Sequence, residues 1–62
     1  MEPILDVLME RDGLTKEEAE ELIREAKEDF HERLESGDLD GLEDICQEWF
    51  GLEPDYIEEL FL

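Results

Sequence analysis

The sequence predicts an all-α fold, a compact three- or four-helix arrangement joined by short loops. Apolar residues recur at spacings of three and four, and no stretch alternates with a period of two for long enough to form a strand. Four glycines and two prolines divide the chain into helix-length pieces. We expect a single domain, residues 1–62, because the chain is short, and its 40% hydrophobic content indicates that it folds.

The first helix is expected at about residues 3–11. Pro3 suits the first turn of a helix, where its missing N–H costs nothing, and Gly13 ends the segment. The apolar side of this helix consists of Ile4, Leu5 and Leu8.

The second helix, about residues 15–35, has the best-specified start. Thr15 and Glu18 form a T-x-x-E capping box, and Leu14 and Ala19 occupy the positions of a hydrophobic staple. The helix is expected to end at Ser36-Gly37. Its core-facing stripe, an arc of about 120° in helical projection, consists of Ala19, Leu22, Ile23, Ala26, Phe30 and Leu34.

The third helix is expected at about 40–50, with Asp38 or Asp40 as its N-cap and Gly51 as its stop. Its apolar side consists of Leu42, Ile45, Cys46, Trp49 and Phe50.

The fourth helix is expected at about 54–61. Pro54 takes its first position. Ile57, Leu60 and Phe61 have the spacing of core residues.

The chain carries 22 acidic and 5 basic residues, a net charge of −17. All five bases precede Leu34, and residues 34–62 contain ten acids and no base. Direct binding to nucleic acid or to an anionic membrane requires a basic surface, so this charge argues against both.

Glutamates recur at alternating spacings of three and four on the side of the second helix opposite its apolar stripe. The row from Glu21 to Glu35 spans about 21 Å, a charge density of the same order as that of one DNA strand at ~3.4 Å per phosphate. We therefore consider it a candidate surface for a protein that normally binds nucleic acid. An ordinary solvent-exposed helix side rich in glutamate is the alternative explanation. The candidate partner-binding residues are Glu21, Glu25, Glu28, Glu32 and Glu35, with Asp38, Asp40, Glu43 and Asp44 as an extension and Tyr56 and Phe61 as apolar anchors.

The row has few compensating cations. Only Glu20–Arg24 and Asp29–Arg33 have the favourable i,i+4 order. A basic flank beside the row consists of Lys16, Arg24, Lys27 and His31. Because the molecule is hardly larger than a Debye length of ~8 Å, its acids repel one another throughout, and this cost suggests that they have a use.

Nothing in the sequence indicates catalysis, and we expect no enzyme, no cofactor and no metal. Aligning Gly13 or Gly41 with the sixth position of a calcium-binding EF-hand loop leaves its last, bidentate position without a carboxylate. Cys46 lies on an apolar helix side and His31 on a polar flank, so a buried structural cysteine is expected. Without a signal peptide or a membrane span, we expect a soluble, cytoplasmic protein.

The segment Gly-Leu-Glu-Pro-Asp-Tyr-Ile-Glu-Glu-Leu-Phe at 51–61, with Leu-Thr-Lys-Glu-Glu-Ala-Glu-Glu-Leu at 14–22, resembles small acidic proteins of uncharacterised function encoded by bacteriophages and prophages. That family supplies no catalytic residues to transfer. The resemblance implies a bacterial host as the setting, where phages often make short acidic proteins that disable host defence or regulatory factors.

Our first hypothesis is thus a non-enzymatic inhibitor of anti-defence, anti-CRISPR or anti-restriction type. It would bind a host nucleic-acid-binding protein through an acidic surface that mimics DNA. The alternative is a small structural or adaptor module that acts through helix-mediated contacts or homodimerises through its first and fourth helices, its charge serving solubility. Weak binding of divalent cations is a third hypothesis.

Overall fold

A computed structural model describes residues 2–61 and confirms the all-α prediction. Over that range it contains four helical segments and no strand. The segments are α1 (Ile4–Asp12), α2 (Lys16–Ser36), α3 (Leu39–Phe50) and the 3₁₀ helix η1 (Pro54–Phe61). Each begins and ends within one residue of the expected position, because the signals at the helix ends are local.

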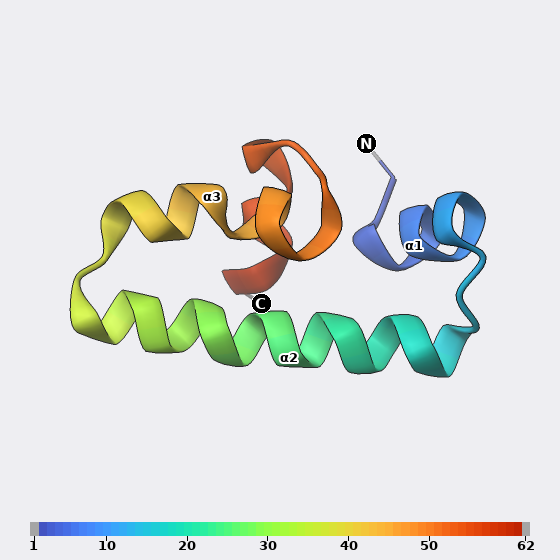
Figure 1. Cartoon of the computed structure of the whole chain (residues 1–62), viewed down its shortest axis with the longest axis horizontal. Coiled ribbons are helices and arrows are strands. Elements are labelled where there is room, and N and C mark those ends of the chain that lie inside the picture. Colours follow the sequence, from blue (N-terminus) through green and yellow to red (C-terminus); the bar gives the residue numbers. More distant parts are fainter. Residues whose placement is uncertain (1, 62) are drawn as a thin grey trace.

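The long helix α2 forms one layer of the fold, and the other elements lie along one side of it (Figure 1). α1 covers its N-terminal half and α3 its C-terminal half, both antiparallel to it, while η1 packs against α3 and α2. The described chain measures 33 × 19 × 18 Å. The side of α2 that faces away from the other elements is therefore open to solvent along its length.

Two predicted N-caps fix the first residues of α2 and α3. The backbone N–H of Glu18 donates to the Thr15 hydroxyl at 3.2 Å, and the Glu18 carboxylate accepts from the Thr15 N–H at 3.0 Å, which completes the capping box. Of the two candidate N-caps of α3, Asp38 takes the position and accepts from the N–H of Gly41 at 3.0 Å. Between the helices, Gly37 adopts a left-handed conformation (φ 78°) and donates to the last carbonyls of α2.

The core lies where α1, α3 and η1 meet the apolar stripe of α2. Its buried side chains are Ile4, Leu8, Ala19, Ala26, Phe30, Leu42, Ile45, Cys46, Phe50 and Leu60. The predicted burial of Cys46 and Phe50 is confirmed, and Trp49 is half-buried against this core. The prediction for Leu34 was wrong. It is 44% exposed because it lies at one edge of the stripe, whereas the contacts between α2 and α3 run along the other edge.

The 3₁₀ geometry of η1 explains which of its side chains are buried. With three residues per turn, side chains at i and i+3 eclipse one another. Ile57 and Leu60 form the edge that packs on the core, whereas Asp55, Glu58 and Phe61 form the exposed edge. The predicted core spacing of Phe61 assumed 3.6 residues per turn and was wrong, since Phe61 is 59% exposed.

Two polar contacts tie α1 to the C-terminal third of the chain. Pro3 offers no side-chain cap to α1, and the Glu59 carboxylate accepts from the Ile4 N–H instead, at 3.0 and 3.2 Å. At the other end of α1, the Arg11 guanidinium donates to the carbonyl of Phe50 at the end of α3. Each contact satisfies a backbone group that a helix terminus leaves without a partner.

Candidate functional site

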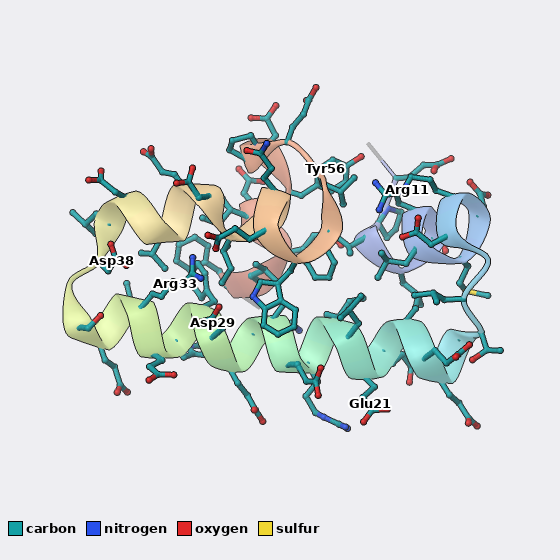
Figure 2. The ribbon with its side chains drawn as sticks, in the orientation of Figure 1. Arg11, Glu21, Asp29, Arg33, Asp38 and Tyr56 are labelled. Carbon is teal, nitrogen blue, oxygen red and sulfur yellow. The ribbon has the colours of Figure 1, made fainter. Side chains whose placement is uncertain are left out.

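The glutamate row lies on the side of α2 that no other element covers. Figure 2 shows Glu21 on this side, pointing away from α1 and α3. The row's residues, all exposed, are Glu21, Glu25, Glu28, Glu32 and Glu35. Because the capping box and Gly37 keep α2 continuous over 21 residues, the carboxylates form one line with a length of about 21 Å.

Within residues 2–61, only one member of the row has a cation within ion-pair distance. Arg24 Nη2 lies 3.8 Å from Glu21 Oε1, and the other four glutamates form no ion pair with any cation among residues 2–61. The expected pair Glu20–Arg24 was wrong, since Glu20 lies 3.9 Å from Lys16 instead. Most of the row's negative charge is thus left to solvent or to a partner.

Two of the three arginines make their contacts elsewhere in the fold rather than at the row. Arg11 contacts Asp12 and the carbonyl of Phe50. Its side-chain hydrogen bond with Asp12 raises the pKa of Arg11 and lowers that of the Asp12 carboxyl.

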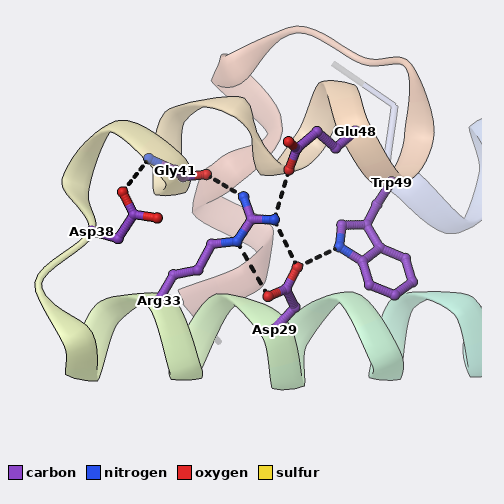
Figure 3. A network of polar contacts seen from close by, with 6 residues as sticks. All are labelled: Asp29, Arg33, Asp38, Gly41, Glu48 and Trp49. Carbon is purple, nitrogen blue, oxygen red and sulfur yellow. Dashed lines mark hydrogen bonds and ion pairs between the residues drawn. The ribbon is translucent and has the colours of Figure 1, made fainter.

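Arg33 is the centre of a polar network between α2 and α3 (Figure 3). It forms the expected ion pair with Asp29, at 3.0 Å, and reaches across to Glu48 of α3 at 2.7 Å. It also donates to the carbonyl of Gly41 at 2.6 Å, and Trp49 Nε1 donates to Asp29 at 2.8 Å. The hydrogen bond that Arg33 donates to the Glu48 carboxylate is the main cause of the raised pKa of Arg33. This network holds α3 on α2. Because Arg33 is paired with Asp29 and Glu48, it does not neutralise the glutamate row.

The acids proposed as an extension of the row lie on another part of the molecule. Asp38 is occupied as the N-cap of α3, while Asp40, Glu43 and Asp44 are exposed on that helix. Asp40 and Asp44 lie opposite the apolar side of α3, which packs on α2, so they face away from the row. The molecule therefore carries two separate acidic surfaces, one on each side of the helix pair.

The two proposed anchors differ in exposure. Tyr56 is half-buried against the core, whereas Phe61 is mostly exposed and contacts Phe30 through an edge-to-face arrangement with ring centroids 4.8 Å apart. Both lie on η1, away from the open side of α2 that carries the row.

The remaining side chains that could act as nucleophiles or metal ligands are not brought together into a site. Cys46 is buried, and burial, followed by the nearby charge of Glu59, raises the pKa of its thiol. His31 packs against the edge of Phe30, with ring centroids 5.8 Å apart. Across residues 2–61, no three His, Cys, Asp or Glu side chains are placed to hold a metal ion.

Sequence reasoning missed the partners that Glu48, Trp49 and Glu59 find across the fold. Each contact joins residues from different helices, and Glu59 lies 55 positions from Ile4. One signal was available, since a helix that begins after Pro3 has no side chain of its own to cap it.

No helix within residues 2–61 combines the length and apolar character needed to cross a bilayer. No protein-family model, curated protein or solved structure matches the chain.

Proposed function

We propose that the protein binds the basic, nucleic-acid-binding surface of another protein through the glutamate row of α2 and thereby keeps nucleic acid from that surface. The observation that carries the proposal is the row itself, with five exposed carboxylates on one helix side and four of them without an ion pair in the described chain. In this proposal the protein is a binding inhibitor without catalytic activity, and the row occupies the positions of backbone phosphates.

The spacing and field of the row support this proposal. Successive glutamates are separated by about 5 Å along α2, a spacing that lysine and arginine side chains of a phosphate-binding groove can follow. Complementary charge accelerates encounter and orients the partners, and it makes the affinity fall as salt rises. The net charge of −17 extends this field over the whole molecule.

The proposed setting is the cytoplasm of a bacterial host, where a phage-encoded inhibitor would meet defence nucleases and transcription regulators. This part of the proposal rests on the resemblance of residues 14–22 and 51–61 to acidic phage proteins. Direct binding to nucleic acid has no place in it, because the row repels phosphate.

A capture experiment tests the proposal. Bacterial lysate proteins that bind DNA-cellulose are passed over the immobilised protein and eluted with stepwise NaCl, and the eluate is identified by mass spectrometry. The expected result is a captured DNA-binding protein that elutes with salt and whose DNA complex the free acidic protein disrupts.

Two triple variants assign the binding to the row. Glu25, Glu28 and Glu32 are changed to glutamine in one, and Glu2, Glu10 and Glu53 in the other. Both variants change the net charge by the same amount, and all six positions are exposed. Only the first should lose capture. Equal capture by both variants would show that the row does not bind the partner.

A further inference from the structure

A groove between α1 and α2 has an apolar floor, and its rim carries two cations and one carboxylate, that of Glu20, which lies 3.9 Å from Lys16 Nζ. It is lined by Leu5 of α1 and by Glu20, Ile23, Arg24 and Lys27 of α2. Arg24 is held only weakly by Glu21, and Lys27 forms no ion pair within the described chain. The groove therefore suits an apolar side chain that has a carboxylate beside it.

The exposed edge of η1 has this combination. Phe61 is 59% exposed, and its ring also makes a T-shaped contact with the buried ring of Phe30. Glu58 precedes Phe61 by three residues and is also exposed, and in a 3₁₀ helix these two side chains lie one above the other. We call Phe61 and Glu58 together the knob, an exposed apolar ring with a carboxylate beside it.

The knob and the groove lie on the same side of α2. Ile23, Lys27, Phe30 and Leu34 follow one another at spacings of four, three and four along that side. The network of Arg33 and Asp29 occupies the other side, where α3 is attached. The knob, at the level of Phe30, is displaced from Ile23 in the groove by about 10 Å along the helix.

We propose that this side of α2 is a self-association surface, on which the Phe61 and Glu58 knob of each copy enters the groove of a second copy. A two-fold axis in the interface, perpendicular to α2 and midway between knob and groove, places both knobs against both grooves at once. Phe61 then covers Leu5 and Ile23 of the second copy, and Glu58 lies beside Arg24 and Lys27. The glutamate row is outside this interface, so the inference does not depend on the proposed function.

Salt affects the two interactions in opposite directions. Each copy carries a charge of −17, so long-range repulsion opposes the dimer and screening favours it. Binding of the row to a basic partner has the opposite dependence. The two proposals can therefore fail independently.

Sedimentation equilibrium of the purified chain tests the inference, at micromolar to millimolar concentrations and in about 50 mM and about 500 mM NaCl. We expect the mass to rise from 7.3 kDa toward twice that value, at lower protein concentration in the higher salt. A mass of 7.3 kDa at every concentration and in both salts would overturn the proposal.

The knob is tested with Phe61→Asp, which should remain monomeric, against Gln47→Glu. The control adds the same single charge at an exposed position of α3 outside the groove and the knob, and should dimerise as the wild type does. Circular dichroism establishes that both variants are folded. Dimerisation of a folded Phe61→Asp variant, or its loss in Gln47→Glu, would contradict the assignment.

A charge swap identifies the second copy as the occupant of the groove. Glu58→Lys lowers the net negative charge, which by itself would favour association, yet it should weaken the dimer at least tenfold because it places lysine beside Arg24 and Lys27. Lys27→Glu should weaken it as well, and the double variant should restore dimerisation. Tighter association of Glu58→Lys, or no recovery in the double variant, would refute the proposed contact.

Discussion

Two groups of charged side chains lie on different sides of α2 and differ in what their charges contact. In the Arg33 network, Arg33 of α2 forms ion pairs with Asp29 of the same helix and with Glu48 of α3. The Arg33 side chain is only 22% exposed. The glutamate row lies on the open side, where four of its five members have no ion pair in the described chain. The charges of the Arg33 network hold two helices together, whereas the charges of the glutamate row make no contact that stabilises the described chain beyond the one between Glu21 and Arg24.

The difference follows from the position of each residue around the helix. Asp29 and Arg33 lie next to the apolar stripe, so α3 brings Glu48 and Trp49 within reach of them. The row lies opposite the stripe and is exposed, and Glu21 points away from the other elements (Figure 2). Charge near a packed side becomes part of the structure, whereas charge opposite it is available for binding.

The largest expected effect comes from breaking the network. Arg33→Met keeps the aliphatic stem but leaves Asp29, Glu48 and the Gly41 carbonyl without their donor. The free energy of unfolding should fall by about 1.5–3 kcal/mol, the range for hydrogen bonds to charged groups. In a domain of this size that loss lowers the Tm by about 4–8 °C per kcal/mol.

Urea denaturation followed by the fluorescence of Trp49 measures the loss. Arg24→Met is the matched control, since Arg24 is an exposed arginine of the same helix whose nearest carboxylate is 3.8 Å away. Its effect should stay within about 0.5 kcal/mol. Similar losses in the two variants would mean that the network contributes no more than an ordinary surface charge.

Removing charge from the glutamate row should instead raise the free energy of unfolding. Changing Glu25, Glu28 and Glu32 to glutamine removes the four like-charge pairs at spacings of three and four within the row, each costing about 0.2–0.5 kcal/mol. The stability should rise by about 1–2 kcal/mol, measured by the same denaturation. For the same reason added NaCl should raise the Tm of the wild type.

Salt also provides the control for the row. In high salt the gain of the triple variant over the wild type should shrink, because the repulsion it relieves is already screened. A destabilised triple variant, or a wild-type Tm that is unchanged or lower in NaCl, would show that the row is not under electrostatic strain.

A smaller loss is expected at the start of α2. Thr15→Ala removes the hydroxyl that accepts from the Glu18 N–H and should cost about 1 kcal/mol, whereas Thr15→Ser keeps the acceptor and should cost less. Thermal unfolding by circular dichroism compares the two. If alanine and serine were equivalent, the capping box would not determine where α2 begins.

The features that could be predicted from the sequence depend on local chemistry. The capping box, the glycine after α2 and the solvent-facing row require only helix geometry and neighbouring residues. The 3₁₀ geometry of η1 was not predicted, because nothing local distinguishes a 3₁₀ segment from an α-helix at Pro54. Phe61 was therefore given both core spacing and a role as an apolar anchor, and only the structure decides that it is exposed. The contacts of Glu59 with Ile4 and of Glu48 with Arg33 join residues distant in sequence, and they exist only once the helices have packed.

The smallest predicted effect is a dependence of stability on pH. It arises from Glu18, a carboxylate near the row that contributes to the fold through its hydrogen bond with Thr15. The hydrogen bond from the Thr15 N–H lowers the pKa of Glu18 below its ordinary value of 4.5. Because the folded pKa is the lower one, the unfolded chain binds more protons between the two values. The stabilisation from the charged carboxylate is present above pH 4.5 and is lost as the pH falls through the folded pKa. Glu18→Gln keeps an acceptor for the Thr15 N–H but removes its negative charge, whereas Glu17→Gln removes the same charge one residue away from this hydrogen bond. Glu18→Gln should therefore be less stable than Glu17→Gln at neutral pH, and the gap should close in acid. A gap in urea denaturation that is constant between about pH 7 and about pH 3 would show that the cap acts through geometry alone and that charge on this side of α2 contributes nothing to the fold.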